Sequence, residues 1–281
     1  MKKHLIGLIG AGIQRSLSPA LQEEEARHHG IRMHYQLIDL DGSRRGVGAL
    51  PGLIEAARVM GYAGLNITYP CKQLVIPLLD SLSAEAQAIG AVNTVVREGD
   101  RLIGHNTDGS GWSWGLQRAL PSADLTRVVL LGAGGAGSAI AYEVLRLGAG
   151  KLAIVDTDRP RAAALAQRMN GLYPAGRAST ADDIATALHG ATGLIQATPV
   201  GMDKHPGLPL PESLLRPGIW VAEIVYVPLE TAFLKAARRI GCHCMDGGHL
   251  NVGQAVRAFR LFTGLEPDAL RMNAHFRRLV S

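Results

Sequence analysis

The amino-acid sequence predicts an α/β protein with two domains, and three observations support this prediction. Short apolar runs rich in β-branched residues alternate with longer segments whose apolar residues recur at helical spacing. A glycine-rich turn between an expected strand and an expected helix begins a second unit of the same kind near residue 128. The chain has 281 residues, whereas a single domain usually has roughly 100–200. This alternation favours parallel sheets joined by crossover helices.

Eight segments have the length and composition of buried strands. They are residues 4–10, 34–40, 64–69, 91–96, 128–133, 151–156, 193–198 and 220–227. The expected helices between them, each with apolar residues at helical spacing, span residues 18–30, 70–82, 135–148, 159–170 and 229–241. Two further helices are expected at residues 250–264 and 267–280.

The domain boundary is expected just after the segment GHNTDGSGW, because the glycine-rich unit starts soon afterwards. The two final helices are too few to fold alone, since a lone helical pair buries little apolar surface. We therefore expect them to pack onto the first domain. This gives a discontinuous first domain at residues 1–108 and 247–281, and a second domain at residues 109–246.

Composition limits the class of protein. Apolar residues make up 47% of the chain, yet no run approaches the ~20 consecutive apolar residues of a membrane span, and the start of the chain lacks the organisation of a signal peptide. Three cysteines, two of them in a C-x-C pair, favour free thiols over a four-ligand zinc site. The net charge of +5 is scattered rather than clustered. We expect a cytoplasmic monomer or homodimer that binds a small molecule, with no metal, nucleic acid or membrane as partner.

The glycine-rich turn has the pattern of a dinucleotide-binding site. Gly132, Gly134 and Gly137 have G-x-G-x-x-G spacing between an expected strand and helix, which allows a tight turn, close approach of a pyrophosphate and close helix packing. A second strand ends in Asp156, 24 residues after Gly132, where an acid meets the adenosine ribose. A turn that only packs tightly is one alternative, and a methyltransferase that binds an adenosyl sulfonium is another.

The residues after Asp156 favour NAD over NADP as the cofactor. A carboxylate hydrogen-bonds two ribose hydroxyls but repels a 2′-phosphate. The segment DTDRPRA also contains Arg159 and Arg161, but Asp156 and Asp158 in the same loop compete with a phosphate for them. NADP remains possible and is less favoured.

Two polar residues are candidates for proton transfer. A helix over residues 70–82 would place Lys72 in its first turn, where the helix macrodipole disfavours a cation by ~0.3–1 kcal/mol and so favours proton exchange near neutral pH. Asp108 is expected at the N-cap of a helix that begins near Gly109, where a carboxylate is stabilised as the anion. An exposed lysine and a plain helix cap are the simpler alternatives.

Seven motifs occur in the order found in one enzyme family. They are SLSP at 16–19, NITYPCK at 66–72, GAVNTV at 90–95, GHNTDG at 104–109, GAGGAG at 132–137, ATPVGM at 197–202 and GQAVRAFRLFTG at 253–264. On these motifs the chain resembles the shikimate dehydrogenase family over almost its whole length. It is most similar to the NAD-preferring quinate/shikimate dehydrogenases, because the family's NADP users generally carry Asn-Arg-Thr where this chain has Asp-Thr-Asp at 156–158.

The resemblance implies a discontinuous substrate domain, a Rossmann NAD-binding domain and a central cleft between them. The implied reaction is the oxidation of the ring 3-hydroxyl of shikimate or quinate, in aromatic amino acid biosynthesis or in quinate breakdown, with Lys72 and Asp108 as the catalytic pair. Ser16 and Ser18 are implied to bind the substrate carboxylate. The other implied substrate residues are Asn66, Thr68, Asn93, Thr107, Asp108, Tyr226 and Gln254.

The implied cofactor residues are Gly132, Ala133, Gly134, Gly135, Ala136, Gly137, Asp156, Thr157, Arg161, Thr198, Pro199, Val200, Met202, Val225 and His249. Bland alternatives exist for several polar residues, since Ser18 could cap a helix and Gln254 could face solvent.

Three residues depart from the family pattern: Arg15 replaces a histidine, Gln196 the asparagine of NATP, and His249 a glycine. They leave open an analogue such as aminoshikimate as substrate, although the serine pair favours shikimate. The remaining alternatives are a dehydrogenase that acts on a folate derivative and a non-catalytic dinucleotide or metabolite sensor.

Overall fold

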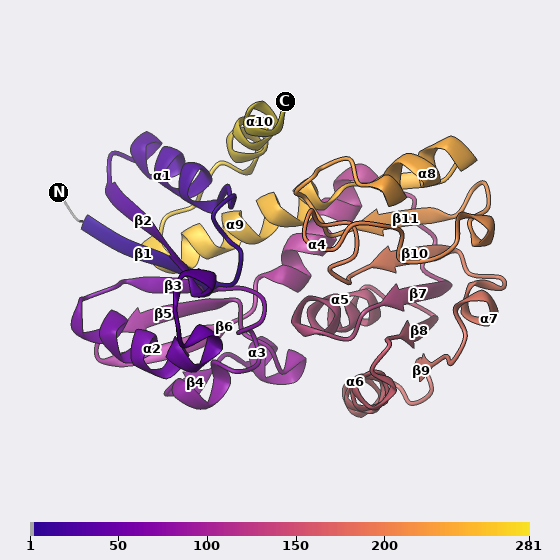
Figure 1. Cartoon of the computed structure of the whole chain (residues 1–281), viewed down its shortest axis with the longest axis horizontal. Coiled ribbons are helices and arrows are strands. Elements are labelled where there is room, and N and C mark those ends of the chain that lie inside the picture. The colour runs from indigo at the N-terminus through magenta and orange to yellow at the C-terminus, as the bar shows by residue number, and fades with distance from the viewer. Residues whose placement is uncertain (1–2) are drawn as a thin grey trace. The chain divides into compact units, whose positions relative to one another are not determined.

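The computed structural model describes residues 3–281 and divides into two compact units. The first contains the chain up to Thr107 together with Gln254–Ser281, and the second is Asp108–Gly253. The sequence-based boundaries were 108/109 and 246/247, so the structure assigns Asp108 and residues 247–253 to the second unit. The final helical segment Gln254–Ser281 belongs to the first unit (Figure 1).

The first unit has a six-stranded sheet in the order β2-β1-β3-β5-β6-β4. The sheet is mixed, because β5 runs antiparallel to both β3 and β6. The strands are β1 (Lys3–Gly10), β2 (Arg32–Asp39), β3 (Gly64–Ile67), β4 (Ser81–Leu82), β5 (Thr94–Glu98) and β6 (Arg101–His105). The helices are α1 (Ser18–His28), α2 (Leu50–Val59), α3 (Ala84–Ile89), α9 (Gly247–Thr263), whose last ten residues belong to this unit, and α10 (Ala269–Val280).

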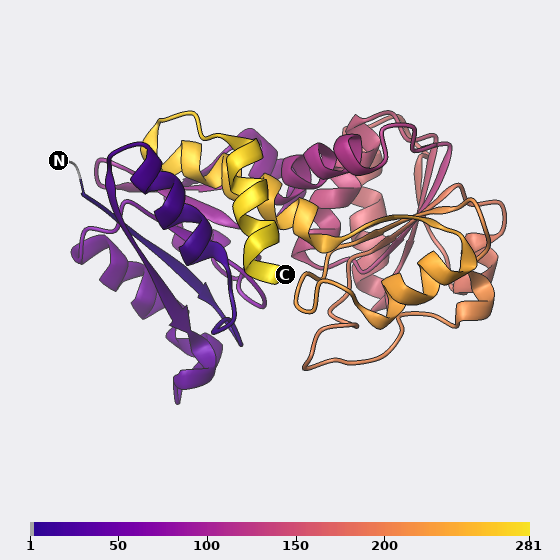
Figure 2. The ribbon, with the colours of Figure 1, turned by 90° about the horizontal axis from the view of Figure 1, so that it is seen from above.

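Both faces of this sheet are buried. The central strand β1 therefore has apolar side chains on both faces, and its sequence is almost continuously apolar. Ile6 and Leu8 point into a core that includes Phe262 of α9, whereas Ile9 belongs to the opposite core with Leu50 and other residues of the α2 side. The C-terminal helix α10 lies beside α1 in both views (Figures 1 and 2). The C-terminal helices α9 and α10 therefore pack, together with α1, on one side of the sheet.

The second unit has six parallel strands in the order β12-β11-β10-β7-β8-β9. The order reverses between β7 and β10, which is the switch point where dinucleotide-binding folds bind their ligand. The strands are β7 (Arg127–Leu131), β8 (Lys151–Val155), β9 (Ala178–Thr180), β10 (Gly193–Gln196), β11 (Trp220–Glu223) and β12 (His243–Met245). The helices are α4 (Asp108–Ala119), α5 (Gly135–Arg146), α6 (Arg159–Leu172), α7 (Ile184–Leu188) and α8 (Ala232–Ile240).

All eight predicted strands are confirmed, with ends that differ by a few residues. The strands β4, β6, β9 and β12 were not predicted, nor were the helices α2, α3 and α7. Most of these elements are short, and short elements carry little periodicity. The helix predicted to begin near Gly109 begins at Asp108.

The predicted helix over residues 70–82 is wrong. Residues 69–75 form successive turns, and only the 3-10 helix Ile76–Leu78 follows. Pro77 has no N–H with which to bond the carbonyl of Gln73, and it disfavours helical backbone at Ile76. The Gln73 carbonyl instead accepts from Ile76 N at 3.3 Å. Lys72 therefore lies in a turn, and the macrodipole argument for its acidity does not hold.

None of the helices within residues 3–281 combines the length and the hydropathy needed to cross a membrane.

Candidate active site

A buried polar network joins the ends of β3, β5 and β6 in the first unit. The carboxamide of Asn66 donates to the Asn93 carbonyl and to Thr94 Oγ1, both at 3.1 Å, and its oxygen accepts from the Tyr35 hydroxyl at 2.6 Å. Because β3 and β5 pair Asn66 with Thr94, the two side chains lie on the same face of the sheet. Both amide hydrogens of Asn66 are therefore used within the protein.

Asn93 extends this network to the segment that precedes Asp108. Its carboxamide oxygen accepts from Thr107 N at 2.8 Å, and its amide nitrogen donates to Thr107 Oγ1 at 2.9 Å. On the other side, Val92 N donates to the Lys72 carbonyl at 2.8 Å. Lys72 and Thr107 are thus held on the two sides of the Val92–Asn93 segment. Asp108 follows Thr107 directly and is buried at the start of α4.

Ser16 and Ser18 meet at the N-terminus of α1. Ser16 Oγ donates to Ser18 Oγ at 3.2 Å and accepts from Ser18 N at 3.3 Å. The helix begins at Ser18, its N-cap is Leu17, and no side chain caps it, so the alternative that Ser18 is a cap is wrong. Arg15 is exposed immediately before this pair. Two hydroxyls at the positive end of a helix suit an anionic group such as a carboxylate.

The three glycines of the dinucleotide motif have distinct surroundings. Gly132 has a φ of +97°, and a Cβ there would lie 2.8 Å from the Ala197 carbonyl oxygen. A Cβ on Gly137 would lie 2.0 Å from the Gly132 carbonyl oxygen, so α5 packs directly on the turn. Gly134 is the N-cap of α5 and has no atom within 4 Å of its Cβ position. The first and third glycines thus allow close packing, and the second leaves room at the helix N-terminus for a pyrophosphate.

Asp156 connects this turn to the loop after β8. One carboxylate oxygen accepts from Ala133 N at 2.7 Å and the other from Asp158 N at 2.8 Å. Thr157 follows Asp156 and is exposed. The geometry holds the Asp156 carboxylate at the end of β8, beside the glycine turn, which is the position of the ribose-binding acid in dinucleotide-binding folds.

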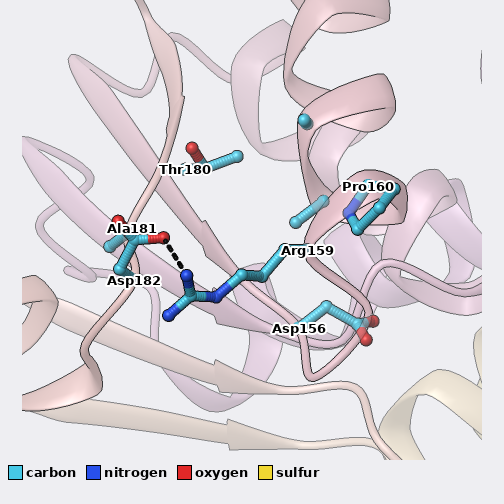
Figure 3. A pocket seen from close by; sticks show the side chains of 8 residues that line it. Asp156, Arg159, Pro160, Thr180, Ala181 and Asp182 are labelled. Carbon is cyan, nitrogen blue, oxygen red and sulfur yellow. Dashed lines mark ion pairs between the residues drawn. The ribbon is translucent and has the colours of Figure 1, made fainter.

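A hollow of about 340 Å³ lies next to Asp156 (Figure 3). The strand β9 ends on one side of it and α6 begins on the other. It is lined by Asp156, Arg159, Pro160, Ala162, Ala163, Thr180, Ala181 and Asp182. The residues present therefore fit an adenosine-like group, since the carboxylate of Asp156 borders a partly apolar hollow.

The two arginines of this region are each paired with a carboxylate. Arg159 lies 3.5 Å from Asp182 across the hollow (Figure 3), and Arg161 lies 2.8 Å from Asp158. Arg159, Thr180 and Asp182 line the hollow but were not among the predicted cofactor residues. Arg159 follows Asp158 directly and could have been chosen, whereas the three-residue strand β9 gave no recognisable signal for the others.

The remaining predicted cofactor residues lie beyond β10 and β11. Thr198, Pro199, Val200 and Met202 form the loop after β10, and Val225 follows β11, next to Tyr226, which was predicted as a substrate residue. Their main chains are thus at the carboxyl ends of strands, the edge where such folds bind ligands. His249 lies in α9, where its Cβ is 2.7 Å from the Cβ position of Gly115 in α4.

Comparison with known proteins identifies the family. The family model of the shikimate dehydrogenase substrate binding domain matches residues 8–95. A shikimate dehydrogenase (NADP(+)) from Streptomyces avermitilis is 56% identical over 99% of this chain and 96% of its own length. The chain belongs to the shikimate dehydrogenase family. It is thus a member of a family of NAD(P)-dependent oxidoreductases, and the resemblance noted in the sequence is confirmed.

Other shikimate dehydrogenase relatives carry NAD in their names. A quinate/shikimate dehydrogenase (NAD(+)) from Corynebacterium efficiens is 46% identical over 97% of each chain. The solved structure of quinate dehydrogenase from Corynebacterium glutamicum in complex with NAD matches 99% of this chain and 100% of its own, with a TM-score of 0.90 and 44% identity. The second unit is accordingly a Rossmann-type dinucleotide-binding domain. These relatives include both NAD and NADP enzymes.

Proposed function

We propose that the protein catalyses the reversible oxidation of the ring 3-hydroxyl of shikimate or quinate to the 3-dehydro ketone, with NAD as the preferred cofactor. The observation that carries this proposal is the network around Asn93. It holds the main chain of Lys72 on one side and Thr107, the chain neighbour of Asp108, on the other. The main chain of Lys72 and the residue before Asp108 therefore both bond to the Val92–Asn93 segment, which supports the assignment of Lys72 and Asp108 to one site.

The chemistry assigned to the pair is proton transfer. Lys72 and Asp108 bind the reacting hydroxyl and take up its proton as the C–H bond breaks, then pass that proton to solvent. When bound, the oxidised nicotinamide supplies the acceptor for the hydride that leaves the same carbon. In the reverse direction the pair returns a proton to the oxygen of the ketone.

The substrate residues divide into two groups by their contacts. Ser16 and Ser18 at the start of α1 are proposed to bind the substrate carboxylate. Thr68, Asn93, Thr107, Tyr226 and Gln254 are proposed to border the ring or its hydroxyls. We assign Asn66 mainly to the support of Asn93 and Thr94, because both of its amide hydrogens are already used.

The preference for NAD rests on charge. A 2′-phosphate at the adenosine ribose would face Asp156, and Arg159 and Arg161 are already paired with Asp182 and Asp158. A ribose with free hydroxyls can instead donate hydrogen bonds to Asp156. We further propose a cytoplasmic location, where the three free cysteines of residues 3–281 would stay reduced.

The test combines the purified protein with NAD or NADP and with shikimate or quinate, and follows the absorbance of the reduced nicotinamide. The proposal predicts reduction with at least one of the two acids, and a higher kcat/KM with NAD than with NADP. No reduction in any of the four combinations would refute the proposed reaction. A higher kcat/KM with NADP would refute only the cofactor preference.

A further inference from the structure

Two fully buried polar side chains end the neighbouring strands β10 and β11. Gln196 and Glu223 are the last residues of these strands, lie opposite each other in the parallel register, and have no exposed surface. A buried carboxamide and a buried carboxylate are costly unless their polar atoms are hydrogen-bonded. Each of them finds its partners in the loop that follows its own strand.

Gln196 organises the loop 197–202. Its amide nitrogen donates to the Val200 carbonyl at 2.7 Å and to the Thr198 carbonyl at 3.2 Å. Its oxygen accepts from Thr198 N at 3.1 Å and from Thr198 Oγ1 at 2.9 Å. One side chain therefore satisfies four polar groups of this loop. The departure from the family's asparagine at this position gives a side chain one methylene longer.

Glu223 closes the loop 224–231 at both ends. One carboxylate oxygen accepts from Ile224 N at 2.8 Å and from Val225 N at 3.0 Å, and the other accepts from Thr231 Oγ1 at 3.1 Å. Thr231 in turn caps α8 by accepting from Leu234 N at 3.1 Å. The carboxylate thus fixes the start of the loop, its end and the first turn of α8.

The two loops also contact each other and the start of α9. The Cβ position of Gly201, whose φ is +103°, lies 3.4 Å from Thr231 Cγ2 and 3.9 Å from Glu223 Oε2. The Cβ position of Gly247 lies 2.3 Å from the Val225 carbonyl oxygen. The carboxylate of Glu223 therefore lies where loop 197–202, loop 224–231 and, through Val225, the first residue of α9 come together.

This junction lies on one side of the switch point. The glycine turn, Asp156 and the hollow occupy the carboxyl ends of β7, β8 and β9, where the adenosine half of a dinucleotide binds. The loops after β10 and β11 lie beyond the switch point, which leaves them for the nicotinamide half. We propose that Gln196 and Glu223 are positioning residues that set these two loops against the nicotinamide half of the cofactor. This inference rests on the proposed function, since it requires a bound nicotinamide dinucleotide.

The test separates the two halves of the cofactor. Wild type and Glu223→Gln are titrated with NAD and with ADP-ribose, which lacks the nicotinamide, and kcat and KM are measured with shikimate. The substitution keeps the shape of the side chain but replaces an accepting oxygen with an NH2 group. We expect NAD binding to weaken roughly tenfold while ADP-ribose binding changes less than about twofold. We also expect kcat to fall by about 10- to 100-fold, because a small misplacement of reacting groups is costly.

A matched control lies at the opposite end of β10. The Thr192 hydroxyl donates to the Asp124 and Arg127 carbonyls at 2.8 and 3.0 Å, so Thr192→Val removes side-chain hydrogen bonds without touching either loop. This variant is expected to bind NAD and ADP-ribose like wild type. Gln196→Asn is a milder second variant that tests the same loops if Glu223→Gln does not fold. It should weaken the binding of NAD more than the binding of ADP-ribose.

The outcomes distinguish this inference from the proposed function. A wild-type protein that binds neither NAD nor NADP would refute the proposed function and this inference with it. The positioning role alone would be refuted if the wild type binds NAD but the variants lose affinity for NAD and for ADP-ribose equally, or lose affinity for neither.

Discussion

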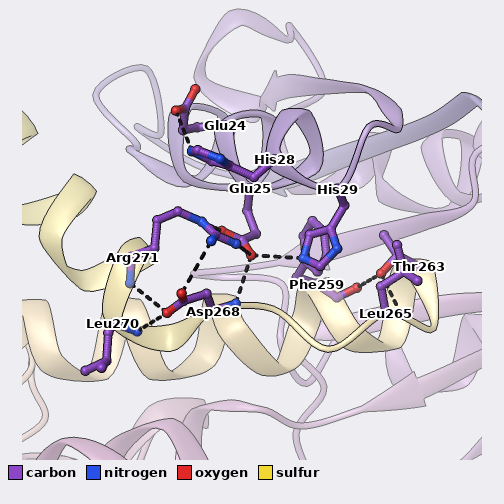
Figure 4. Close-up of polar contacts among 10 residues, drawn as sticks. All are labelled: Glu24, Glu25, His28, His29, Phe259, Thr263, Leu265, Asp268, Leu270 and Arg271. Carbon is purple, nitrogen blue, oxygen red and sulfur yellow. Dashed lines mark hydrogen bonds and ion pairs between the residues drawn. The ribbon is translucent and has the colours of Figure 1, made fainter.

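The ion pair between Glu25 and Arg271 is expected to hold the C-terminal helix α10 on α1. The Glu25 side chain is 1% exposed, and its two oxygens accept from Arg271 Nε at 2.9 Å and Arg271 Nη2 at 2.6 Å (Figure 4). Asp268 N, at 2.8 Å, and His29 Nε2, at 3.1 Å, complete its contacts. Burial raises the pKa of Glu25, but the hydrogen bonds from Arg271 and Asp268 outweigh this effect and hold the pKa below its usual value.

Arg271→Ala should therefore destabilise the first unit substantially. Removing one partner of a buried ion pair costs about 3–5 kcal/mol, because the other charge stays buried. The Arg271 side chain is 32% exposed, and two partners of Glu25 remain, so water and these partners recover part of the loss. We expect the free energy of unfolding to fall by about 2–3 kcal/mol. The double variant with Glu25→Gln should lose much less than the sum of the single variants.

The assay is urea unfolding of the wild type, the two single variants and the double variant at pH 7. Arg278→Ala is the matched control, since Arg278 is exposed on the same helix, and it should change the free energy of unfolding by less than about 0.5 kcal/mol. Because the folded-state pKa of Glu25 is lowered, its stabilisation is present above the pKa of the unfolded state and is lost as the pH falls through the folded pKa. An Arg271→Ala variant as stable as Arg278→Ala, or strictly additive effects, would contradict this account.

Three further predictions concern the second unit and the reaction. Lys72→Ala should lower kcat by ~10²–10⁴-fold, as for other positioned proton-transfer groups. The measurement is a steady-state assay with saturating NAD and shikimate, and an unchanged kcat would show that Lys72 is not a member of the catalytic pair. Asp156→Ser should weaken NAD binding, measured by calorimetry, and lower the ratio of the affinity for NAD to the affinity for NADP. An unaltered ratio would contradict the proposal that Asp156 binds the ribose hydroxyls. Burial raises the pKa of Glu223 to about 7 despite its hydrogen bonds. The folded state therefore holds its proton more tightly than the unfolded state, and stability falls by an amount on the order of 3 kcal/mol as the pH rises from about 4.5 past 7. Glu223→Gln should remove this slope from the curve of stability against pH, and parallel curves would be the contrary result.

The sheets and the dinucleotide turn could be predicted from sequence because their signals are local. Buried strands such as β1 and β7 contain nearly continuous apolar runs, and the glycine pattern reports a backbone requirement that no other residue meets. The prediction of a helix over residues 70–82 was wrong for a local reason that the sequence contains, since Pro77 interrupts the helical pattern.

The features that could not be predicted depend on tertiary contacts. Glu25 is one of three successive glutamates, and only the packing of α10 makes it the buried one. Glu223 lies within an apolar strand pattern, so nothing in the sequence marked its carboxylate as the centre of a loop junction. The network of Asn66, Asn93 and Thr107 joins segments whose side chains meet only once the sheet has formed.

The most direct test of the central claim is a crystal structure of the protein with NAD and the better of the two acids bound. The account predicts that Lys72 Nζ and a carboxylate oxygen of Asp108 both lie within about 3.2 Å of the same ring hydroxyl oxygen. The carbon that bears this hydroxyl should face the nicotinamide ring. A complex in which either side chain contacts another part of the substrate, or none of it, would contradict the proposed catalytic pair.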